Sequence, residues 1–232
     1  MRNKSNMYQL SKRQWNPFVG CEYGCSYCKP SFQAQLKRWA KGKCELCYNY
    51  KPHVHPERLD QGLPITDYMQ FIFTCANGDV AFCPTYFLEA IIQRIEKEPN
   101  KTFLIQSKNP ATFSRVKFPR NVILGTTIET NRDDITTKIS KAPLPSARVE
   151  AFEKIEHNLK MLTFEPIMIF DLDEMLEIAK RINPAMIWMG YDSKNCKLQE
   201  PALFRFKRLH SLLSCMGFVV ILKTVREAWW EK

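Results

Sequence analysis

The sequence predicts an α/β fold in which parallel strands and helices alternate and curl into a partial or nearly closed (β/α) barrel. Three observations predict this class. Short apolar runs, rich in Ile, Val and Phe and bounded by Pro, Gly, Asn or charged residues, recur along the chain. Segments with a helical apolar period lie between them. At 232 residues, of which 45% are hydrophobic, the chain is long enough to bury one sizeable core.

The expected strands are apolar runs of the length that suits burial on both faces of a sheet. The first lies near residues 15–20. The others are residues 70–74, 102–106, 122–128, 160–164, 185–189 and 218–222. An open, doubly wound sheet is the alternative to the barrel. In both arrangements, ligands bind at the carboxyl ends of the strands.

Three expected helices join these strands. Residues 84–97 begin with a proline and carry an apolar stripe that includes Leu88 and Ile95. Residues 171–182 and 201–216 have apolar positions at the same helical spacing. Because parallel strands joined by helices form right-handed βαβ units, this alternation favours one parallel sheet covered by helices.

The chain has no internal repeat and no long linker. We therefore expect one domain over residues 1–232, with a cysteine-rich insertion at about residues 41–58. No apolar run is long enough to cross a membrane, and the first twenty residues carry no apolar block. The sequence thus predicts no signal peptide, no membrane partner and a cytoplasmic location.

Charge and cysteine content indicate an anionic partner and a metal. Residues 1–58 hold eleven Lys or Arg and three acidic residues, a surplus of eight within a net charge of +10. Such a surplus suits an anionic substrate or nucleic acid, with a solvated basic surface as the alternative. Five of the nine cysteines fall between positions 21 and 47. In a reducing cytosol this crowding indicates metal ligands rather than disulfides.

Cys21, Cys25 and Cys28 form a C-x3-C-x2-C motif directly after the first expected strand. Three thiolates at this spacing can bind three irons of a [4Fe–4S] cluster and leave the fourth iron open to another ligand. Zinc is the alternative, but structural zinc sites usually use CxxC pairs or CxxC with histidine. The triplet therefore favours the iron–sulfur cluster.

A second group of potential ligands is a CxxC pair followed by two nearby histidines: Cys44, Cys47, His53 and His55. These residues form an acceptable tetrahedral zinc set. They could instead bind an auxiliary iron–sulfur cluster together with Cys75 or Cys83. Reduced thiols in a basic loop are the third interpretation.

The cysteine spacing resembles the signature of the radical S-adenosylmethionine (SAM) superfamily, in which an aromatic residue stands just before the third cysteine, as Tyr27 does here. Further segments resemble a phage- and archaea-associated radical SAM family whose members mostly lack an assigned reaction. That family is similar to spore photoproduct lyase, a DNA-repair enzyme. The segments are residues 15–21, 55–59, 73–79, 106–110, 124–129, 164–166, 189–192 and 222–226.

The resemblance implies a radical SAM enzyme of lyase or transferase-like type with a partial barrel. Its cluster would cleave SAM reductively to a 5′-deoxyadenosyl radical, which would act on a substrate that is not yet assigned, with nucleic acid or nucleotides as candidates. The amino and carboxylate groups of SAM would bind the open iron, and Tyr27 would lie against the adenine. The resemblance also implies an electron donor of the flavodoxin or ferredoxin type.

The resemblance further implies SAM contacts from residues at the ends of the expected strands. The candidates are Asn77, Gly78, Asp79, Ser107, Lys108, Thr126, Glu129, Glu165 and Gly190. Asp79 would bind the SAM amino group, although the common Gly-Gly-Glu form is absent here. Lys108 would meet the SAM carboxylate, and Glu129 or Glu165 would accept hydrogen bonds from the ribose. A structural salt bridge or helix cap is the alternative for each carboxylate.

Cys75 is the candidate catalytic residue, because it ends a strand at the expected active-site face. A thiol there could donate a hydrogen atom to a substrate radical, as a cysteine does in spore photoproduct lyase, whereas a buried core thiol is the alternative. Near the end of the chain, Arg226, Trp229 and Trp230 could stack on bases or pack against the barrel. Two other functions stay open: a zinc-dependent nucleic-acid-binding module without catalysis, and a radical SAM enzyme acting on a peptide or small metabolite.

Overall fold

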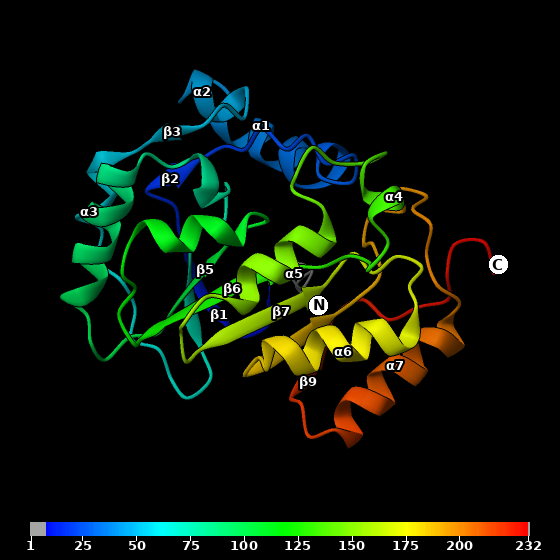
Figure 1. Cartoon of the computed structure of the whole chain (residues 1–232). Helices are drawn as coiled ribbons and strands as arrows, with labels where there is room; N and C mark the ends of the chain where they lie inside the picture. Colours follow the sequence, from blue (N-terminus) through cyan, green and yellow to red (C-terminus); the bar gives the residue numbers. More distant parts are fainter. Residues whose placement is uncertain (1–7, 232) are drawn as a thin grey trace.

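The structure is a computed structural model that describes residues 8–231. Residues 1–7, which include Arg2 and Lys4 of the basic segment, and Lys232 lie outside the described residues. Within them, the main sheet has seven parallel strands in the order β1-β4-β5-β6-β7-β8-β9 (Figure 1). Their bounds are β1 Ser11–Trp15, β4 Phe71–Thr74, β5 Phe103–Gln106, β6 Val122–Thr127, β7 Lys160–Phe164, β8 Met186–Met189 and β9 Val220–Leu222.

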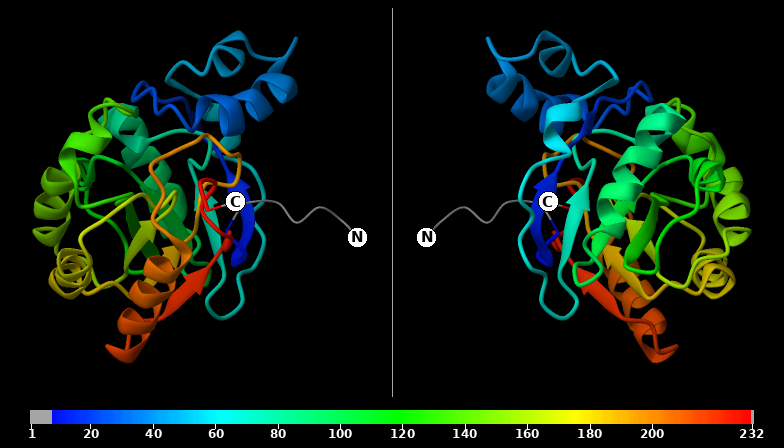
Figure 2. Two further views of the ribbon diagram at one scale, coloured as in Figure 1. Left: turned by 90° about the vertical axis from the view of Figure 1, so that its right-hand side faces the viewer. Right: turned by 90° about the vertical axis from the view of Figure 1, so that its left-hand side faces the viewer.

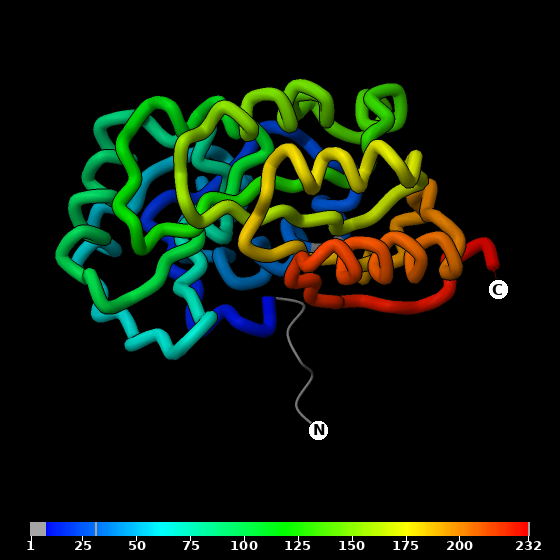
Figure 3. Tube along the Cα trace, turned by 60° about the horizontal axis from the view of Figure 1, so that its bottom comes forward, coloured from blue at the N-terminus to red at the C-terminus, as the bar shows by residue number. Residues whose placement is uncertain are grey.

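The sheet curls into a half-barrel with helices on its outer face (Figure 2). β1 and β9 are the edge strands, so the barrel is open between them. The covering helices are α3 Thr85–Glu96, α5 Pro145–Glu153, α6 Leu172–Ile182 and α7 Leu203–Cys215. α6 and α7 run side by side (Figures 1 and 3). The shorter elements along the strand ends are η3 Val80–Phe82, η4 Pro110–Arg115 and α4 Asp133–Thr136.

Alternate residues of the strands enter two separate cores. Ile105, Leu124 and Leu162 pack in a large outer core with the apolar faces of the helices. Leu104 and Trp188 pack in a smaller inner core, to which none of the helices contributes a buried residue among those described. A doubly wound sheet would carry helices on both faces, so this arrangement confirms the partial barrel and not its alternative.

A cysteine-rich excursion leaves the sheet between β1 and β4 and projects beyond the strand ends (Figures 1 and 2). It contains β2 Phe18–Val19, η1 Lys29–Gln33, α1 Ala34–Ala40, α2 Glu45–Tyr48, β3 His53–Val54 and η2 Pro56–Arg58. β2 and β3 pair in antiparallel fashion, with Val19 opposite His53. After α2, the excursion therefore returns to pair with β2, which ends two residues before Cys21.

The first strand differs from its expected position. β1 ends at Trp15, whereas the sequence predicted the first strand near residues 15–20. Its sequence, Ser-Lys-Arg-Gln-Trp, is polar because β1 is an edge strand with exposed residues, so it lacks the apolar run of a buried strand. Residues 18–19 are apolar because they pair with β3 instead. The other six strands lie within their expected ranges, trimmed by at most two residues at an end. Over residues 8–231, every helix is too short or too polar to cross a membrane.

Candidate active site at the carboxyl ends of the strands

The cysteine triplet lies on a loop that is tied to the strand ends from two sides. Gly20, just before the triplet, accepts a hydrogen bond from the amide of Asp79 (3.1 Å) and donates one to the carbonyl of Asn77 (3.0 Å). The segment after β4 therefore holds the start of the loop, and Gly78 forms a bridge with Gly20.

The second tie comes from the segment after α4. Ser26 donates its amide hydrogen to the carbonyl of Ile139 at 2.8 Å, and Lys141 donates to the carbonyl of Tyr23 at 2.8 Å. Both ties are hydrogen bonds between backbone atoms. The triplet is thereby fixed between the ends of β4 and β6.

The three thiols of the triplet differ in burial and in neighbours. Cys25 is buried and its Sγ lies 3.1 Å from Ser140 Oγ, whereas Cys21 and Cys28 are partly exposed. Burial raises the pKa of Cys28 to about 11, and the Cys25 charge adds to the shift. Burial and then the Asp79 carboxylate raise the pKa of Cys21. Positive charge, such as that of a bound metal, would favour the thiolate forms of Cys21 and Cys28.

A buried ion network lies beside the triplet. Glu129 has no exposed surface, and its Oε2 accepts a hydrogen bond from Arg148 Nη1 at 2.6 Å. Its Oε1 contacts Lys108 Nζ and accepts a hydrogen bond from Tyr27 Oη at 2.5 Å. Burial by itself would raise the pKa of Glu129, but the charges of Lys108 and Arg148 outweigh it and hold this pKa at about 2. Glu129 is therefore an anion at neutral pH.

Lys108 connects this network to the triplet. Its Nζ contacts the Tyr27 hydroxyl, lies 4.6 Å from the Tyr27 ring centroid and donates to Cys25 Sγ at 3.6 Å. Lys108, which follows β5, thus links Cys25 to Tyr27 and Glu129, which come from the segments after β2 and β6.

Asp79, Ser107 and Thr126 form a neighbouring set of hydrogen bonds. Asp79 Oδ1 accepts from Ser107 Oγ at 2.5 Å and from the amide of Ala81 at 3.0 Å, and its Oδ2 accepts from the amide of Lys108 at 2.8 Å. Thr126 Oγ1 donates to the carbonyl of Ser107 at 2.8 Å. Asp79 thereby caps η3 and joins the ends of β4 and β5, which is the capping arrangement that the sequence left open. Burial raises its pKa in spite of these hydrogen bonds.

Glu165 and Gly190 belong to a second group, at the ends of β7 and β8. Glu165 Oε2 pairs with Lys223 Nζ at 2.5 Å. A Cβ added at Gly190 would lie 3.1 Å from the amide nitrogen of Thr224, so the glycine allows the chain after β9 to approach closely. Glu165 therefore has its own cation, separate from the pair of Glu129 and Lys108.

The Cys75 thiol lies in the outer core together with Cys83. Cys75 has a left-handed backbone (φ +55°) and donates its amide hydrogen to the carbonyl of Trp15 at 2.7 Å. Burial raises the pKa of its thiol. The core position is the alternative that the sequence left open, and the catalytic role stays a prediction.

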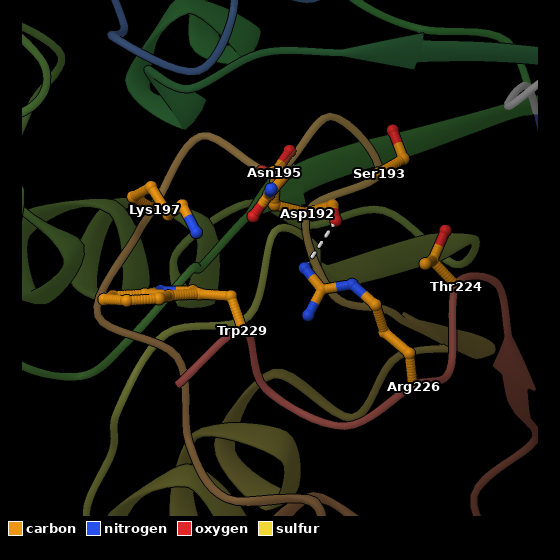
Figure 4. A pocket seen from close by; sticks show the side chains of 7 residues that line it. All are labelled: Asp192, Ser193, Asn195, Lys197, Thr224, Arg226 and Trp229. Carbon is orange, nitrogen blue, oxygen red and sulfur yellow. Dashed lines mark hydrogen bonds between the residues drawn. The ribbon is translucent and has the colours of Figure 1, made fainter. Parts of the chain in front are cut away.

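A polar pocket of about 390 Å³ opens at the ends of β8 and β9, where Arg226 points toward Asp192 and the Trp229 ring lies beneath Lys197 (Figure 4). Arg226 forms a bidentate ion pair with Glu200 at 2.8 and 2.5 Å and donates to the carbonyl of Asp192 at 2.8 Å. Trp229 lies under Lys197 Nζ, 4.6 Å from its ring centroid. The other lining residues are Ser193, Asn195 and Thr224.

The main residue that sequence reasoning missed is Arg148, because helix α5 was not expected. Its buried positions, Pro145, Arg148, Val149 and Phe152, have the spacing of a helix face, but an arginine occupies one of them. A charged residue at an apolar position of a helical repeat was the available signal. It indicates a buried partner of opposite charge, here Glu129.

The second predicted ligand group, Cys44, Cys47, His53 and His55, lies in the excursion. Its four ligand atoms come together as the sequence suggested. These four residues lie on or beside α2 and β3, and none of them belongs to the ion network of Glu129.

The fold resembles two kinds of solved structure. SuiB of Streptococcus suis, bound to S-adenosylmethionine, superposes with a TM-score of 0.54 at 9% identity, over 93% of this chain and 50% of SuiB. A spore photoproduct lyase mutant with a dinucleoside spore photoproduct superposes with a TM-score of 0.52 at 11% identity, over 90% of this chain and 64% of the lyase. The chain thus spans about half to two thirds of their length.

Both neighbours are radical SAM enzymes, so the half-barrel is of the radical SAM type. The chain belongs to the family described as protein of unknown function (DUF5131), which matches residues 6–179. This match includes the triplet, the second ligand group and the ion network. Among curated proteins, no relative matches the chain.

Proposed function

We propose that this protein is a radical SAM enzyme in which Cys21, Cys25 and Cys28 bind a [4Fe–4S] cluster. The three thiolates would bind three irons, and the fourth iron would be open to SAM. One observation carries the proposal: the triplet lies at the carboxyl ends of the strands of a radical SAM-type half-barrel, beside buried polar residues.

The donor set supports an iron–sulfur cluster. Cysteine thiolates are the usual ligands of such clusters, and the three thiols lie within one short segment between Cys21 and Cys28. The Lys108 ammonium, 3.6 Å from Cys25 Sγ, would offset part of the negative charge that the thiolates bring.

The residues around the triplet suit the polar parts of SAM. When bound, the cluster and SAM together would supply a 5′-deoxyadenosyl radical that removes a hydrogen atom from the substrate. Tyr27, held by Lys108 and Glu129, would line the adenine site. Lys108 would pair with the SAM carboxylate. Glu129, whose other oxygen is bound by Arg148, would accept a hydrogen bond from the ribose.

The remaining candidates would position this pocket or border it. Asn77 and Gly78 would hold the loop through their backbone, and Asp79, Ser107 and Thr126 would hold the strand ends in register. Asp79 keeps lone-pair capacity for the SAM amino group beyond its three hydrogen bonds. Glu165 and Gly190 would border the pocket from the side of β7 and β8.

We further propose an anionic substrate or partner, with nucleic acid as the leading class. The charge surplus of residues 1–58 supports it, and Lys37, Arg38, Lys41 and Lys43 are exposed on and after α1. The electron donor would be of the flavodoxin or ferredoxin type, and the reaction would be of the lyase or transferase-like type. A peptide or a small metabolite is the competing substrate class.

Anaerobic reconstitution tests the proposal. The wild-type protein should bind about four irons at this site, as a cubane requires, and form 5′-deoxyadenosine from SAM and a strong reductant. Replacing the triplet by alanine should abolish both. Cys215→Ala, at an exposed cysteine of α7, should change neither. A triplet variant that keeps its iron and its 5′-deoxyadenosine would overturn the assignment.

A further inference from the structure

We propose that Cys44, Cys47, His53 and His55 bind one structural zinc ion, which holds the start of the cysteine-triplet loop. One ligand atom from each residue lies within 4.8 Å of the other three. His53 Nε2 is 3.5 Å from Cys44 Sγ and 3.3 Å from Cys47 Sγ, and His55 Nε2 is 3.2 Å from Cys47 Sγ.

These distances suit ligands of a single ion. In a tetrahedral zinc site with Zn–S of about 2.3 Å and Zn–N of about 2.0–2.1 Å, sulfur and nitrogen ligands are about 3.6 Å apart. The three measured distances fall within a few tenths of an ångström of that value. Ligands on two different irons of a cluster would be farther apart. The geometry therefore favours one ion over an auxiliary cluster, and Cys75 and Cys83 lie elsewhere, in the outer core.

The histidine tautomers are set by neighbours outside the group. His53 Nδ1 lies 2.7 Å from the carbonyl oxygen of Lys51, and His55 Nδ1 lies 2.9 Å from Glu57 Oε1. Both oxygens are acceptors, so each Nδ1 donates a hydrogen to its oxygen and each Nε2, which faces the thiols, is the nitrogen that can bind a metal. Metal-bound histidines are held by outer hydrogen bonds of this kind.

Hydrogen bonding within the group accounts for at most two of these three contacts, because the two thiols together have two hydrogens to donate. Cys47 Sγ is within 3.3 Å of both Nε2 atoms, but a thiol has one hydrogen to donate. The Cys47 amide also donates to Cys44 Sγ at 3.4 Å, which suits a thiolate acceptor. A cation at the centre satisfies the sulfur and nitrogen lone pairs together. Two thiolates and two imidazoles form a ligand set that suits zinc.

The surroundings explain why a metal is needed. The buried core of the excursion is small: Val19, Ala40 and Cys47, with Leu36 and Cys44 partly buried. Small units with so little apolar burial usually depend on a metal or a disulfide. Cys47 and His55 are themselves buried, so the ion would be shielded from exchange with solvent.

The same residues anchor the triplet loop. His53 pairs with Val19 across β2 and β3, and the His55 amide donates to the carbonyl of Pro17 at 2.6 Å. A metal bound to both histidines therefore holds β3 against β2, which directly precedes Cys21. Zinc would be a structural element of this protein, separate from any redox centre.

Metal analysis of the full chain tests the proposal independently of the cluster. With Cys21, Cys25 and Cys28 all replaced by alanine, and purification without chelator, we expect about one zinc per chain. Adding Cys44→Ser and Cys47→Ser should reduce zinc to background, whereas adding Cys215→Ser should not. Cobalt added to the chain in place of zinc should give the visible spectrum of a tetrahedral thiolate site, which the Cys44→Ser and Cys47→Ser variant should lack.

A second pair of variants separates the removal of a ligand from a failure to fold. His53→Ala should weaken zinc binding, and His53→Cys, which restores a zinc ligand, should recover it. Finding no zinc in the triplet variant, finding iron in its place, or equal zinc with and without Cys44 and Cys47 would overturn the proposal. These outcomes do not depend on whether the triplet binds a cluster.

Discussion

At the residue scale, the candidate site centres on a carboxylate that is fully buried between two cations. Glu129 pairs with Arg148, which is itself fully buried and also donates hydrogen bonds to the carbonyls of Pro143 and Thr127. Removing one partner of a buried pair leaves an uncompensated charge in a medium of low dielectric constant. The rigidity of the pair keeps the Oε1 atom of Glu129 directed toward Tyr27 and Lys108.

Arg148→Met should lower the free energy of unfolding by about 3–5 kcal/mol, because it strips the buried carboxylate of one cation. Adding Glu129→Gln should recover part of the loss. Urea denaturation measures both changes. Arg181→Met is the matched control, because Arg181 pairs with Glu153 at 2.5 Å on the exposed surface, where the loss should be much smaller. Equal losses at the two arginines would contradict the expectation.

The depressed pKa of Glu129 predicts a pH dependence. A carboxyl group with a lowered folded-state pKa stabilises the fold above its unfolded-state value, and this contribution is lost as the pH falls. For Glu129 the loss should run from about 4.5 down to about 2. Over this interval the unfolding free energy of the wild type should fall more steeply than that of Glu129→Gln. Asp79 has the opposite sign, because burial raises its pKa above the ordinary value of 3.8. It stabilises the fold as the pH falls toward 3.8, so above that pH Asp79→Asn should lose stability more steeply than the wild type.

At the element scale, two elements differ from the sequence prediction because of what they pack or pair against. β1 was expected too late because an edge strand needs no continuous apolar run, and α5 was missed because Arg148 interrupts its apolar face. The helices α3, α6 and α7 were expected within two residues of their bounds, since each buries an uncharged apolar stripe. The apolar period of the sequence therefore predicts a helix well when the buried face of that helix carries only apolar side chains.

Gly20, at the start of the triplet loop, lies in close contact with Lys51 of the excursion. It has φ +104°, and an added Cβ would lie 2.3 Å from the backbone oxygen of Lys51. Gly217 has φ +89° and open space around it. Gly217→Ala should therefore lower the free energy of unfolding by the backbone strain, about 1–2 kcal/mol. Gly20→Ala should lower it further and should also reduce the iron that the reconstituted protein binds at Cys21. Equal effects on stability and no effect on iron would contradict this role of Gly20.

At the scale of the whole molecule, positive charge is unevenly spread. The net charge is +10, and residues 1–58 carry a surplus of eight. Half of that surplus comes from the excursion, where residues 18–58 hold seven basic and three acidic residues. α1 and α2 project beyond the carboxyl ends of the strands (Figure 2). Trp39 on α1 is exposed beside basic side chains. Under the proposed function, this ring and these cations would contact a single-stranded nucleic acid.

Reversing Lys37, Arg38, Lys41 and Lys43 to glutamate should weaken binding to labelled oligonucleotides. It should also lower the salt dependence of binding, by about one unit of slope for each phosphate that the protein no longer neutralises. 5′-Deoxyadenosine formation should be unchanged. The control reverses four exposed basic residues elsewhere, Lys97, Lys117, Lys207 and Arg208, with the same change of net charge. Titrations at two salt concentrations compare the variants. No binding by the wild type at low salt would favour a peptide or small-metabolite substrate.

The sequence by itself determined the half-barrel class, the ligand groups and the strand-end candidates, because apolar period and cysteine spacing depend on near neighbours along the chain. Only the tertiary structure decided which candidates meet. Lys108 contacts Cys25 and pairs with Glu129, whereas Glu165 pairs with Lys223. Strand order and register decide such pairings, and they arise from contacts between residues far apart in sequence. Arg148 required both kinds of information. Its place at an apolar position of a helical repeat is a local signal, but its partner Glu129, which follows β6, is identified only by the tertiary structure.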